Sequence, residues 1–342
     1  MKAKILVTGG TGYIGSHTVV ELQHAGFEVV IVDDLSNSTE GVVDQILQIT
    51  GIRPEFHRFN LQNLELLEKL FEQSKGIDAV IHFAAFKAVG ESVAKPLQYY
   101  RNNLLSLINL FDCMERFQVK NLVFSSSCTV YGQPDQLPVT EQTPRQTAES
   151  PYGNTKIVCE DIIRDNTRAN PGIHTIALRY FNPIGAHSSA LIGELPNGVP
   201  NNLVPFVTQT AAGIREQLQV FGDDYNTPDG SCIRDYINVV DLAKAHVISI
   251  ERLLNQQNEG PFEFFNVGTG KGVSVLELLH AFERATGQKV NYKIVGRRAG
   301  DIEQIFADTT KANKVLGWKS DVSLDDTLLS AWNWEKKIRG MA

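Results

Sequence analysis

A glycine-rich turn after a short apolar run constrains this 342-residue chain more than any other feature of its sequence. The apolar run ends at Val7, and the turn, Thr8–Gly15 (TGGTGYIG), leads into a helical pattern of apolar residues. Gly9, Gly12 and Gly15 permit a tight turn, a close approach of backbone to a diphosphate, and close packing of helix on strand. The helix then directs the positive end of its dipole at the anion. The sequence therefore predicts a dinucleotide-binding turn, although glycines also occur in turns for reasons of turn geometry alone.

An acidic residue at the end of the next apolar run indicates which dinucleotide binds. The run 29–32 is followed directly by Asp33. A carboxylate there accepts hydrogen bonds from the hydroxyls of the adenine ribose and repels a 2′-phosphate. Asn37 and Ser38 follow closely enough to complete the adenine side. We therefore expect NAD rather than NADP as the cofactor.

The first half of the chain alternates short apolar runs with amphipathic segments. The runs lie at 4–7, 29–32, 79–83, 121–125 and 174–181, and helical patterns lie at 14–25, at 61–74 and from Pro96. The runs are apolar throughout, as in parallel strands that are buried on both faces. Strand–helix alternation at this spacing predicts an α/β fold, a Rossmann-type doubly wound parallel sheet.

The character of the sequence changes after the run 174–181. Residues 182–202 hold several prolines, glycines and asparagines without a period, and long irregular loops in compact domains are usually functional. Short strands and helices are mixed after this loop. We predict an NAD-binding domain at 1–181 and a smaller mixed α/β substrate-binding lobe at 182–342. The segment 236–260 fits either unit, and its assignment is left open.

Composition excludes several classes of function. The net charge of −7 argues against non-specific binding to nucleic acid or to a membrane surface, which requires a basic field. No run approaches the ~18 apolar residues of a membrane span, and the first ten residues lack a secretory apolar region. The four cysteines are scattered without a C-x-x-C pair, and the eight histidines form no metal-binding motif. We expect a cytoplasmic protein with free thiols and no metal.

A serine, a tyrosine and a lysine form a candidate catalytic group. Ser127 follows the run 121–125, and Tyr152 and Lys156 are four residues apart, on one face of a predicted helix. A free phenol has a pKa of about 10 and is a poor base at neutral pH. A nearby ammonium and a cationic nicotinamide ring both favour the phenolate. The alternative interpretation is a Tyr/Lys pair on a solvated helix face.

Taken together, these motifs make the chain similar to a known family. It resembles the extended short-chain dehydrogenase/reductases and, among them, the UDP-glucose 4-epimerases. The matching segments are 9–17, 82–96 (HFAAFKAVGESVAKP), 124–132 (FSSSCTVYG), 150–156, 178–187 (LRYFNPIGAH), 198–205 (GVPNNLVP), 234–242 (RDYINVVDL) and 297–301 (RRAGD). They cover nearly the whole chain, and the FNPIGAH and PNNL segments are typical of sugar-nucleotide epimerases.

The resemblance implies a reversible oxidation at C4 of a UDP-hexose. Tyr152 takes the proton of the sugar 4-hydroxyl, NAD takes the hydride, and the 4-keto sugar turns and is reduced on its other face. NAD is regenerated in each turnover, so tight binding is expected. The family also implies a homodimer, with helices such as Pro96–Phe117 and Tyr152–Ala169 at its interface.

The resemblance and the motifs together supply the candidate site residues. The candidate catalytic residues are Tyr152, Lys156 and Ser127. The candidate cofactor-binding residues are Gly9, Gly12, Tyr13, Ile14, Gly15, Asp33, Asn37, Ser38, Asn60, Leu61, Phe83, Ala84, Lys87, Asn102, Ser127, Tyr152, Lys156 and Phe181. The candidate substrate-binding residues are Ser127, Tyr152, Asn182, Asn202, Leu203, Phe221, Arg234, Arg298, Asp301 and Ile305. Arginine suits the diphosphate because its planar fork matches phosphate oxygens and keeps its charge.

The chain departs from the family pattern at three positions. Asn60 replaces an acidic residue that is often found near the adenine, which puts that contact in doubt. Asn238 replaces a common histidine, and we interpret it as structural. Ile305 replaces a residue that is commonly tyrosine in bacterial relatives. The smaller side chain leaves room in the sugar pocket, so UDP-N-acetyl-hexosamines become candidate substrates.

Three other functions share parts of this sequence pattern. A nucleotide-sugar 4,6-dehydratase needs an additional acid/base, which those relatives supply as carboxylates where this chain has Cys128 and Thr129. An NAD-sensing binding protein typically lacks the Tyr/Lys pair that this chain keeps. A simple NAD-dependent dehydrogenase releases NADH. Formation of UDP-glucose from UDP-galactose without added NAD separates an epimerase from all three.

Overall fold

The central element is a seven-stranded sheet in which every neighbouring pair of strands is parallel. The computed structural model describes residues 3–298 and 300–341. In spatial order the strands are β11 (Phe262–Val267), β6 (His174–Tyr180), β5 (Asn121–Ser127), β4 (Ile77–His82), β1 (Lys4–Thr8), β2 (Glu28–Asp33) and β3 (Glu55–Arg58). The strand order reverses at β1, where a doubly wound sheet opens a crevice at the carboxyl ends of its strands. The predicted Rossmann-type sheet is confirmed.

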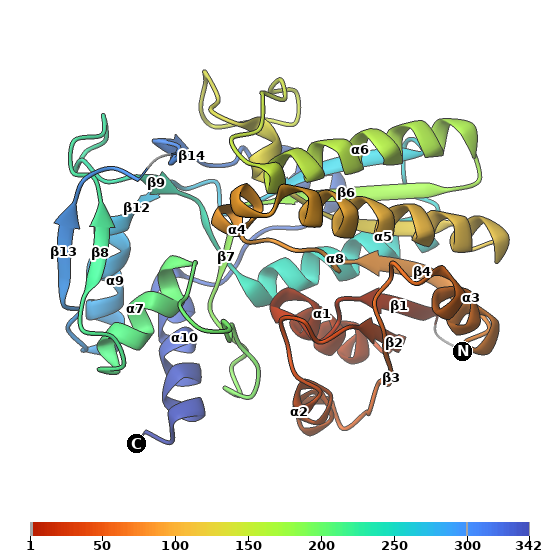
Figure 1. The fold of residues 1–342 in the computed structure, drawn as a ribbon, viewed down its shortest axis with the longest axis horizontal. Helices are drawn as coiled ribbons and strands as arrows, with labels where there is room; N and C mark the ends of the chain where they lie inside the picture. Colours follow the sequence, from red (N-terminus) through yellow and green to blue (C-terminus); the bar gives the residue numbers. More distant parts are fainter. Residues whose placement is uncertain (1–2, 299, 342) are drawn as a thin grey trace.

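Helices cover both faces of this sheet (Figure 1). One layer holds α1 (Tyr13–His24), α2 (Gly41–Thr50) and α8 (Val239–Leu254), and the other holds α3 (Leu64–Gln73), α5 (Pro96–Arg116), α6 (Pro151–Ala169) and the short α4 (Val89–Ala94). Ile5 and Val7 of β1 belong to the core beneath α1, whereas Leu6 between them belongs to the core beneath α5. Both faces are therefore buried, which explains why the strands are apolar throughout instead of alternating.

A smaller assembly of helices and short strands stands beside the carboxyl ends of the sheet, at the left of Figure 1. Its helices are α7 (Leu203–Ala211), α9 (Val275–Thr286) and α10 (Leu324–Arg339). Its strands are β8 (Leu218–Phe221) with β13 (Tyr292–Val295), and β9 (Ile233–Arg234) with β12 (Val273–Ser274) and β14 (Gln304–Ile305). A core that includes Phe282 and Trp332 joins α9 to α10.

Short connecting elements complete the described chain. They are the pair β7 (Asn182–Ile184) and β10 (Tyr236–Asn238), a 3-10 turn at Cys128–Tyr131 and a π-helical turn at Ala312–Leu316. Two later elements, α8 and β11, lie in the layers of the large sheet. The division into units at 1–181 and 182–342 stays a prediction. None of the helices among the described residues is both long enough and apolar enough to cross a membrane.

The structure differs from the expected elements in a few places, each with a physical reason. Strand β3 has no apolar run of its own in the sequence, because an edge strand is only half-buried and its sequence, EFHR, is largely polar. Helix α3 begins at Leu64 instead of residue 61, because the Asn63 side chain caps it by accepting a hydrogen bond from the Leu66 amide. Strand β5 continues to Ser127, so the serines lie in the strand itself.

Candidate active site

One cavity of about 1000 Å³ lies between the carboxyl ends of the large sheet and the smaller assembly. Every catalytic, cofactor-binding and substrate-binding residue proposed from the sequence lines this cavity. Residues as distant in sequence as Gly9 and Ile305 thus come together in one space. The structure establishes this proximity, and the role of each residue remains a proposal.

The glycine turn at one end of the cavity has a geometry that only glycine accommodates. Gly9 has φ +72°, in the left-handed region. A Cβ atom on Gly15 would lie 2.2 Å from the Gly9 carbonyl oxygen, so no side chain fits there. Gly12 stands at the N-cap of α1. The turn therefore exposes backbone at a helix N-terminus, which is the arrangement that a dinucleotide diphosphate requires.

Asp33 is fixed at the end of β2 by its own hydrogen bonds. One carboxylate oxygen accepts from the Thr11 amide at 3.2 Å, and the other accepts from the Leu35 amide at 2.9 Å. The Ser38 hydroxyl also donates to Asp33 at 3.4 Å. The carboxylate is thus held beside the glycine turn on the cavity wall, where a ribose with free hydroxyls fits and a 2′-phosphate is repelled. The glycine turn and Asp33 together fit NAD.

A second carboxylate, which the sequence analysis missed, stands next to Asn60. The Asn60 side-chain amide donates to Asp34 at 2.7 Å, and the Asn60 side-chain oxygen accepts from the Gln62 amide at 2.9 Å. Asp34 also lines the cavity. The acidic group that the family often has at position 60 is thus matched here by Asp34, which directly follows the adjacent strand β2. Two consecutive aspartates at the end of an apolar run were the available signal.

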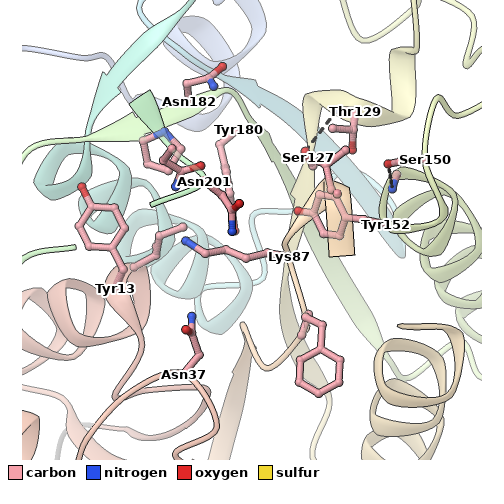
Figure 2. A pocket seen from close by; sticks show the side chains of 18 of the residues that line it. Tyr13, Asn37, Lys87, Ser127, Thr129, Ser150, Tyr152, Tyr180, Asn182 and Asn201 are labelled. Carbon is pink, nitrogen blue, oxygen red and sulfur yellow. Dashed lines mark hydrogen bonds between the residues drawn. The ribbon is translucent and has the colours of Figure 1, made fainter. Parts of the chain in front are cut away.

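The candidate catalytic group lies where β5 ends and α6 begins. Ser127 is the last residue of β5, and Tyr152 lies in the first turn of α6, which Ser150 caps by accepting from the Gly153 amide. Figure 2 shows the Tyr152 ring beside Ser127, with its hydroxyl directed into the cavity. Lys156 donates from Nζ to the Ser125 carbonyl oxygen at 2.6 Å. Its Nζ lies 6.0 Å from the centre of the Tyr152 ring.

Burial dominates the titration of this group. It raises the pKa of Tyr152 above its usual range, the nearby Tyr180 raises it further, and the Ser127 hydroxyl opposes both. Burial also lowers the pKa of Lys156 to about 8. The expected stabilisation of the phenolate by Lys156 therefore does not by itself outweigh desolvation. A further positive charge in the cavity is needed, and the oxidised nicotinamide ring supplies one.

The other end of the cavity holds a positive group over an aromatic ring. Arg298 pairs with Asp301 at 2.7 Å, and its guanidinium carbon lies 5.3 Å from the centre of the Phe221 ring. Arg234, on β9, donates to the Ile233 carbonyl oxygen at 2.8 Å. Arg234, Arg298 and the Phe221 ring together suit a nucleoside diphosphate. The guanidinium groups can bind the phosphate oxygens, and the aromatic ring can pack against the base or the ribose.

The remaining substrate candidates frame the middle of the cavity. Asn182 begins β7, and Asn202 and Leu203 form the N-cap and first residue of α7. Ile305 on β14 pairs in register with Arg234 on β9. Ile305 borders the cavity, but only 2% of its surface is exposed, because most of the side chain packs in a core with Cys128 and Phe181.

Two further observations concern residues outside the proposed set. Tyr180, which hydrogen-bonds the Ser125 hydroxyl, lines the cavity; its position at the carboxyl end of an apolar strand fits a cofactor contact and a core residue equally, so the sequence left it outside the candidate set. Asn238 caps α8 by accepting from the Val240 amide at 2.8 Å, in agreement with its structural interpretation. In residues 3–298 and 300–341, no group of three or more His, Cys, Asp or Glu side chains could hold a metal ion.

Comparison with known proteins decides the family. A family model described as GDP-mannose 4,6 dehydratase matches residues 6–330. A curated UDP-glucose 4-epimerase of Cyamopsis tetragonoloba is 51% identical over 336 residues, which are 97% of this chain and 95% of that protein. The chain belongs to the UDP-glucose 4-epimerase family.

Solved structures of this epimerase family superpose closely on the fold. The UDP-glucose 4-epimerase of Bifidobacterium longum, in complex with NAD⁺ and UDP, is 46% identical with a TM-score of 0.94, and 98% of each chain is covered. The enzyme of Stenotrophomonas maltophila, with bound NAD and formylated UDP-arabinopyranose, is 48% identical with a TM-score of 0.96, covering 99% of this chain and 100% of that chain.

Proposed function

We propose that this protein is an NAD-dependent UDP-glucose 4-epimerase, an isomerase that interconverts UDP-glucose and UDP-galactose through a transient 4-keto sugar. The observation that carries the proposal is the single cavity that holds the glycine turn, the Ser127–Tyr152–Lys156 group and the Arg234–Arg298 pair. Membership in the epimerase family supports it, and so do the NAD and UDP complexes of the solved relatives.

In this function, Tyr152 moves one proton in each direction. Its phenolate oxygen accepts the proton of the sugar 4-hydroxyl, and it returns the proton to the 4-oxygen after the sugar has turned. Bound NAD⁺ accepts the C4 hydride and returns it to the opposite face. Ser127 orients the 4-oxygen by hydrogen bonding. Lys156, with a pKa of about 8, carries its positive charge at neutral pH and is held in place by the Ser125 carbonyl.

The two ends of the cavity hold their ligands differently, which allows the sugar to turn. The glycine turn and Asp33 fix the cofactor at one end, and Arg234 and Arg298 fix the UDP diphosphate at the other. The hexose between them is attached only through the diphosphate. Rotation about that link presents either face of C4 to the same Tyr152 and the same cofactor.

The rival functions are separated by product analysis. In the dehydratase, elimination needs an additional acid/base, and the positions concerned are Cys128, whose pKa burial raises to about 12, and Thr129, which has no carboxylate. Purified protein is incubated with UDP-galactose without added NAD. UDP-glucose supports the epimerase, a 4-keto-6-deoxy product indicates the dehydratase, and absence of turnover indicates the NAD-sensing protein.

The size of the sugar pocket supports a broader substrate range. Ile305 forms part of the cavity wall and is smaller than the tyrosine that is common at this position in bacterial relatives. The space that it leaves fits the N-acetyl group of a UDP-N-acetyl-hexosamine. The protein therefore accepts UDP-N-acetylglucosamine and UDP-N-acetylgalactosamine in addition to the simple hexoses.

A homodimer is part of the same proposal. Helix α5 carries Leu97, Ile108 and Leu105, of which Leu97 is 73% exposed. Apolar side chains on the outer side of a helix layer favour burial against a second copy. α5 and α6 of two protomers would form a four-helix interface away from the cavity. The four cysteines are all free and buried, which supports a reducing, cytoplasmic location.

A further inference from the structure

The irregular segment 185–202, which joins β7 to α7, touches several turns that follow strands of the large sheet. The Tyr13 hydroxyl donates to the Gly185 carbonyl oxygen at 2.6 Å, and the Asn197 side chain donates to the Ser36 carbonyl oxygen at 3.5 Å. Tyr13 and Ser36 both line the cavity at its cofactor end. The segment therefore crosses from the substrate end to the cofactor end.

Glu194 in this segment binds side chains from both ends of the cavity with one oxygen atom. Its Oε1 atom accepts from Lys87 Nζ at 3.3 Å and from the side-chain Nδ2 of Asn202 at 2.5 Å. Lys87 follows β4 and is a cofactor candidate, whereas Asn202 occupies the N-cap position of α7 and is a substrate candidate. The Glu194 side chain is only 11% exposed, so the carboxylate is largely shielded from solvent.

The position of Glu194 is fixed from behind by α10. The Trp334 indole donates to the Glu194 carbonyl oxygen at 3.1 Å. A Cβ atom on Gly193 would lie 2.5 Å from the Trp334 ring, so the backbone packs directly on the indole. The backbone that carries the carboxylate is therefore held against α10, and Lys87 and Asn202 both donate to this fixed position.

Lys87 is the more exposed partner of this ion pair. Its side chain is 44% exposed, and its Nζ lies 5.8 Å from the centre of the Tyr13 ring. Figure 2 shows Lys87 extending across the cavity toward Tyr13. A lysine side chain loses considerable rotamer freedom when it is held in one orientation. An ion pair that holds it in the cavity lowers the cost of ordering it around a bound dinucleotide.

We propose that Glu194 is a positioning residue that orders Lys87 for the cofactor and Asn202 for the UDP-sugar through the same carboxylate oxygen. This inference rests on the proposed function, because the ligands of Lys87 and Asn202 are those of the epimerase. Glu194 would thus assist the reaction without contacting the sugar C4 or the nicotinamide ring. Its two effects also differ in kind, because Lys87 requires the negative charge whereas Asn202 requires only an acceptor oxygen.

Two substitutions separate the charge from the acceptor. Glu194→Gln keeps an acceptor oxygen for Asn202 but removes the charge that holds Lys87. We expect NAD to dissociate about threefold faster, in line with the modest strength of a partly exposed ion pair. The dissociation constant of UDP changes little. Glu194→Ala removes both interactions, so NAD dissociation accelerates similarly and UDP binding weakens about fivefold.

The measurements are the rate of NAD release from purified holoenzyme and the UDP dissociation constant by calorimetry. Glu283→Gln is the matched control, because Glu283 forms a similar pair with Lys289 on the outer surface. The loss in Glu194→Gln is expected in cofactor retention, and Glu283→Gln is expected to release NAD at the rate of the unsubstituted protein. If Glu194→Ala does not fold, Glu194→Gln alone decides the charge effect.

Three results would overturn the inference. Unchanged NAD release in Glu194→Gln would show that the charge does not position Lys87. Unchanged UDP binding in a folded Glu194→Ala would remove the effect on Asn202. Equal losses of both ligands in Glu194→Gln would indicate a general packing defect. The unsubstituted holoenzyme is assayed first with UDP-galactose, so failure of the proposed function is recognised before any variant is compared.

Discussion

Tyr152 shows how the surroundings of one residue set its chemistry. The protein alone raises the pKa of this phenol by burial, although catalysis requires the phenolate. The cofactor ring therefore has two tasks, to accept hydride and to lower the pKa of Tyr152 by its positive charge. If Tyr152 is the base, we therefore expect proton removal to be favoured only when oxidised cofactor is in place.

Replacement of Tyr152 tests its role as the base. We expect Tyr152→Phe to retain bound NAD and to lose about 10²- to 10⁴-fold in kcat, which is the usual contribution of a positioned acid–base group. Tyr100→Phe is the control, because it removes a hydroxyl that accepts a hydrogen bond from the Asn154 side chain on α6, the helix that also carries Tyr152. Cofactor content is measured by absorbance and turnover with UDP-galactose. Substantial residual activity in Tyr152→Phe would exclude it as the base.

The lowered pKa of Lys156 predicts a dependence of stability on pH. The folded protein binds this proton with a pKa of about 8, compared with 10.5 for an ordinary lysine. Between these values the unfolded chain holds more protons, so the contribution of Lys156 to the free energy of unfolding rises with pH. Below pH 8 the cost of burying the charge is fully present.

Urea unfolding measures this contribution as a difference. We compare the protein with Lys156→Met at pH ~7.5 and pH ~9.5, so that all other titrating groups cancel. The stability advantage of Lys156→Met over the unsubstituted protein is expected to shrink at the higher pH. An advantage that is constant or grows with pH would contradict a lowered Lys156 pKa.

Ile305 determines the predicted substrate range at the residue scale. Ile305→Tyr fills the space beside the sugar and is expected to reduce kcat/KM for UDP-N-acetylgalactosamine more than for UDP-galactose. Relative rates with the two substrates are measured for both proteins. Equal losses for both sugars would show that pocket size does not govern the choice.

At the scale of elements, a buried ion pair fixes α6 to the sheet beneath the catalytic group. Arg179 on β6 donates to both oxygens of Glu160 on α6, at 2.8 and 2.6 Å. The Ser126 hydroxyl donates to the same carboxylate at 2.6 Å. Glu160 follows Lys156 by one helical turn, and Ser126 precedes Ser127. The network therefore sets the register between the helix that carries Tyr152 and the strand that carries Ser127.

Removal of one partner of this pair is predicted to be costly. Arg179→Met leaves the Glu160 carboxylate buried without its partner, and we expect a loss of about 3–5 kcal/mol in the free energy of unfolding. The double variant Arg179→Met/Glu160→Leu should recover part of that loss. Both are measured by denaturant unfolding at neutral pH. A double variant less stable than Arg179→Met would contradict this interpretation of the pair.

The sequence predicted the large elements well and the small ones poorly. Buried parallel strands and the glycine turn have strong local signals, as β1 and the turn at Gly9 illustrate. The two-residue strand β14 has none, because its pairing with β9 depends on a chain segment that is distant in sequence. The same holds for Glu194, whose partner Lys87 lies 107 residues away. Asp34 was missed although its sequence position signalled it.

At the scale of the whole molecule, the sign of the net charge does not predict the charge of the ligands. The chain carries −7, yet the proposed function places two diphosphates in its cavity. One meets the backbone of the glycine turn and the other meets Arg234 and Arg298, so each is matched locally. Overall charge argues against non-specific binding of nucleic acid but carries no information about a nucleotide bound in the cavity.

The central claim is that the hydride removed from C4 of the sugar stays on bound cofactor, inside one cavity, until it returns to C4. It is tested most directly with UDP-galactose deuterated at C4, without added cofactor. We predict that UDP-glucose forms with the deuterium retained at C4 and that no reduced cofactor appears in solution. Loss of deuterium to water or to released NADH would contradict the account, because the hydride would then leave the cavity between oxidation and reduction.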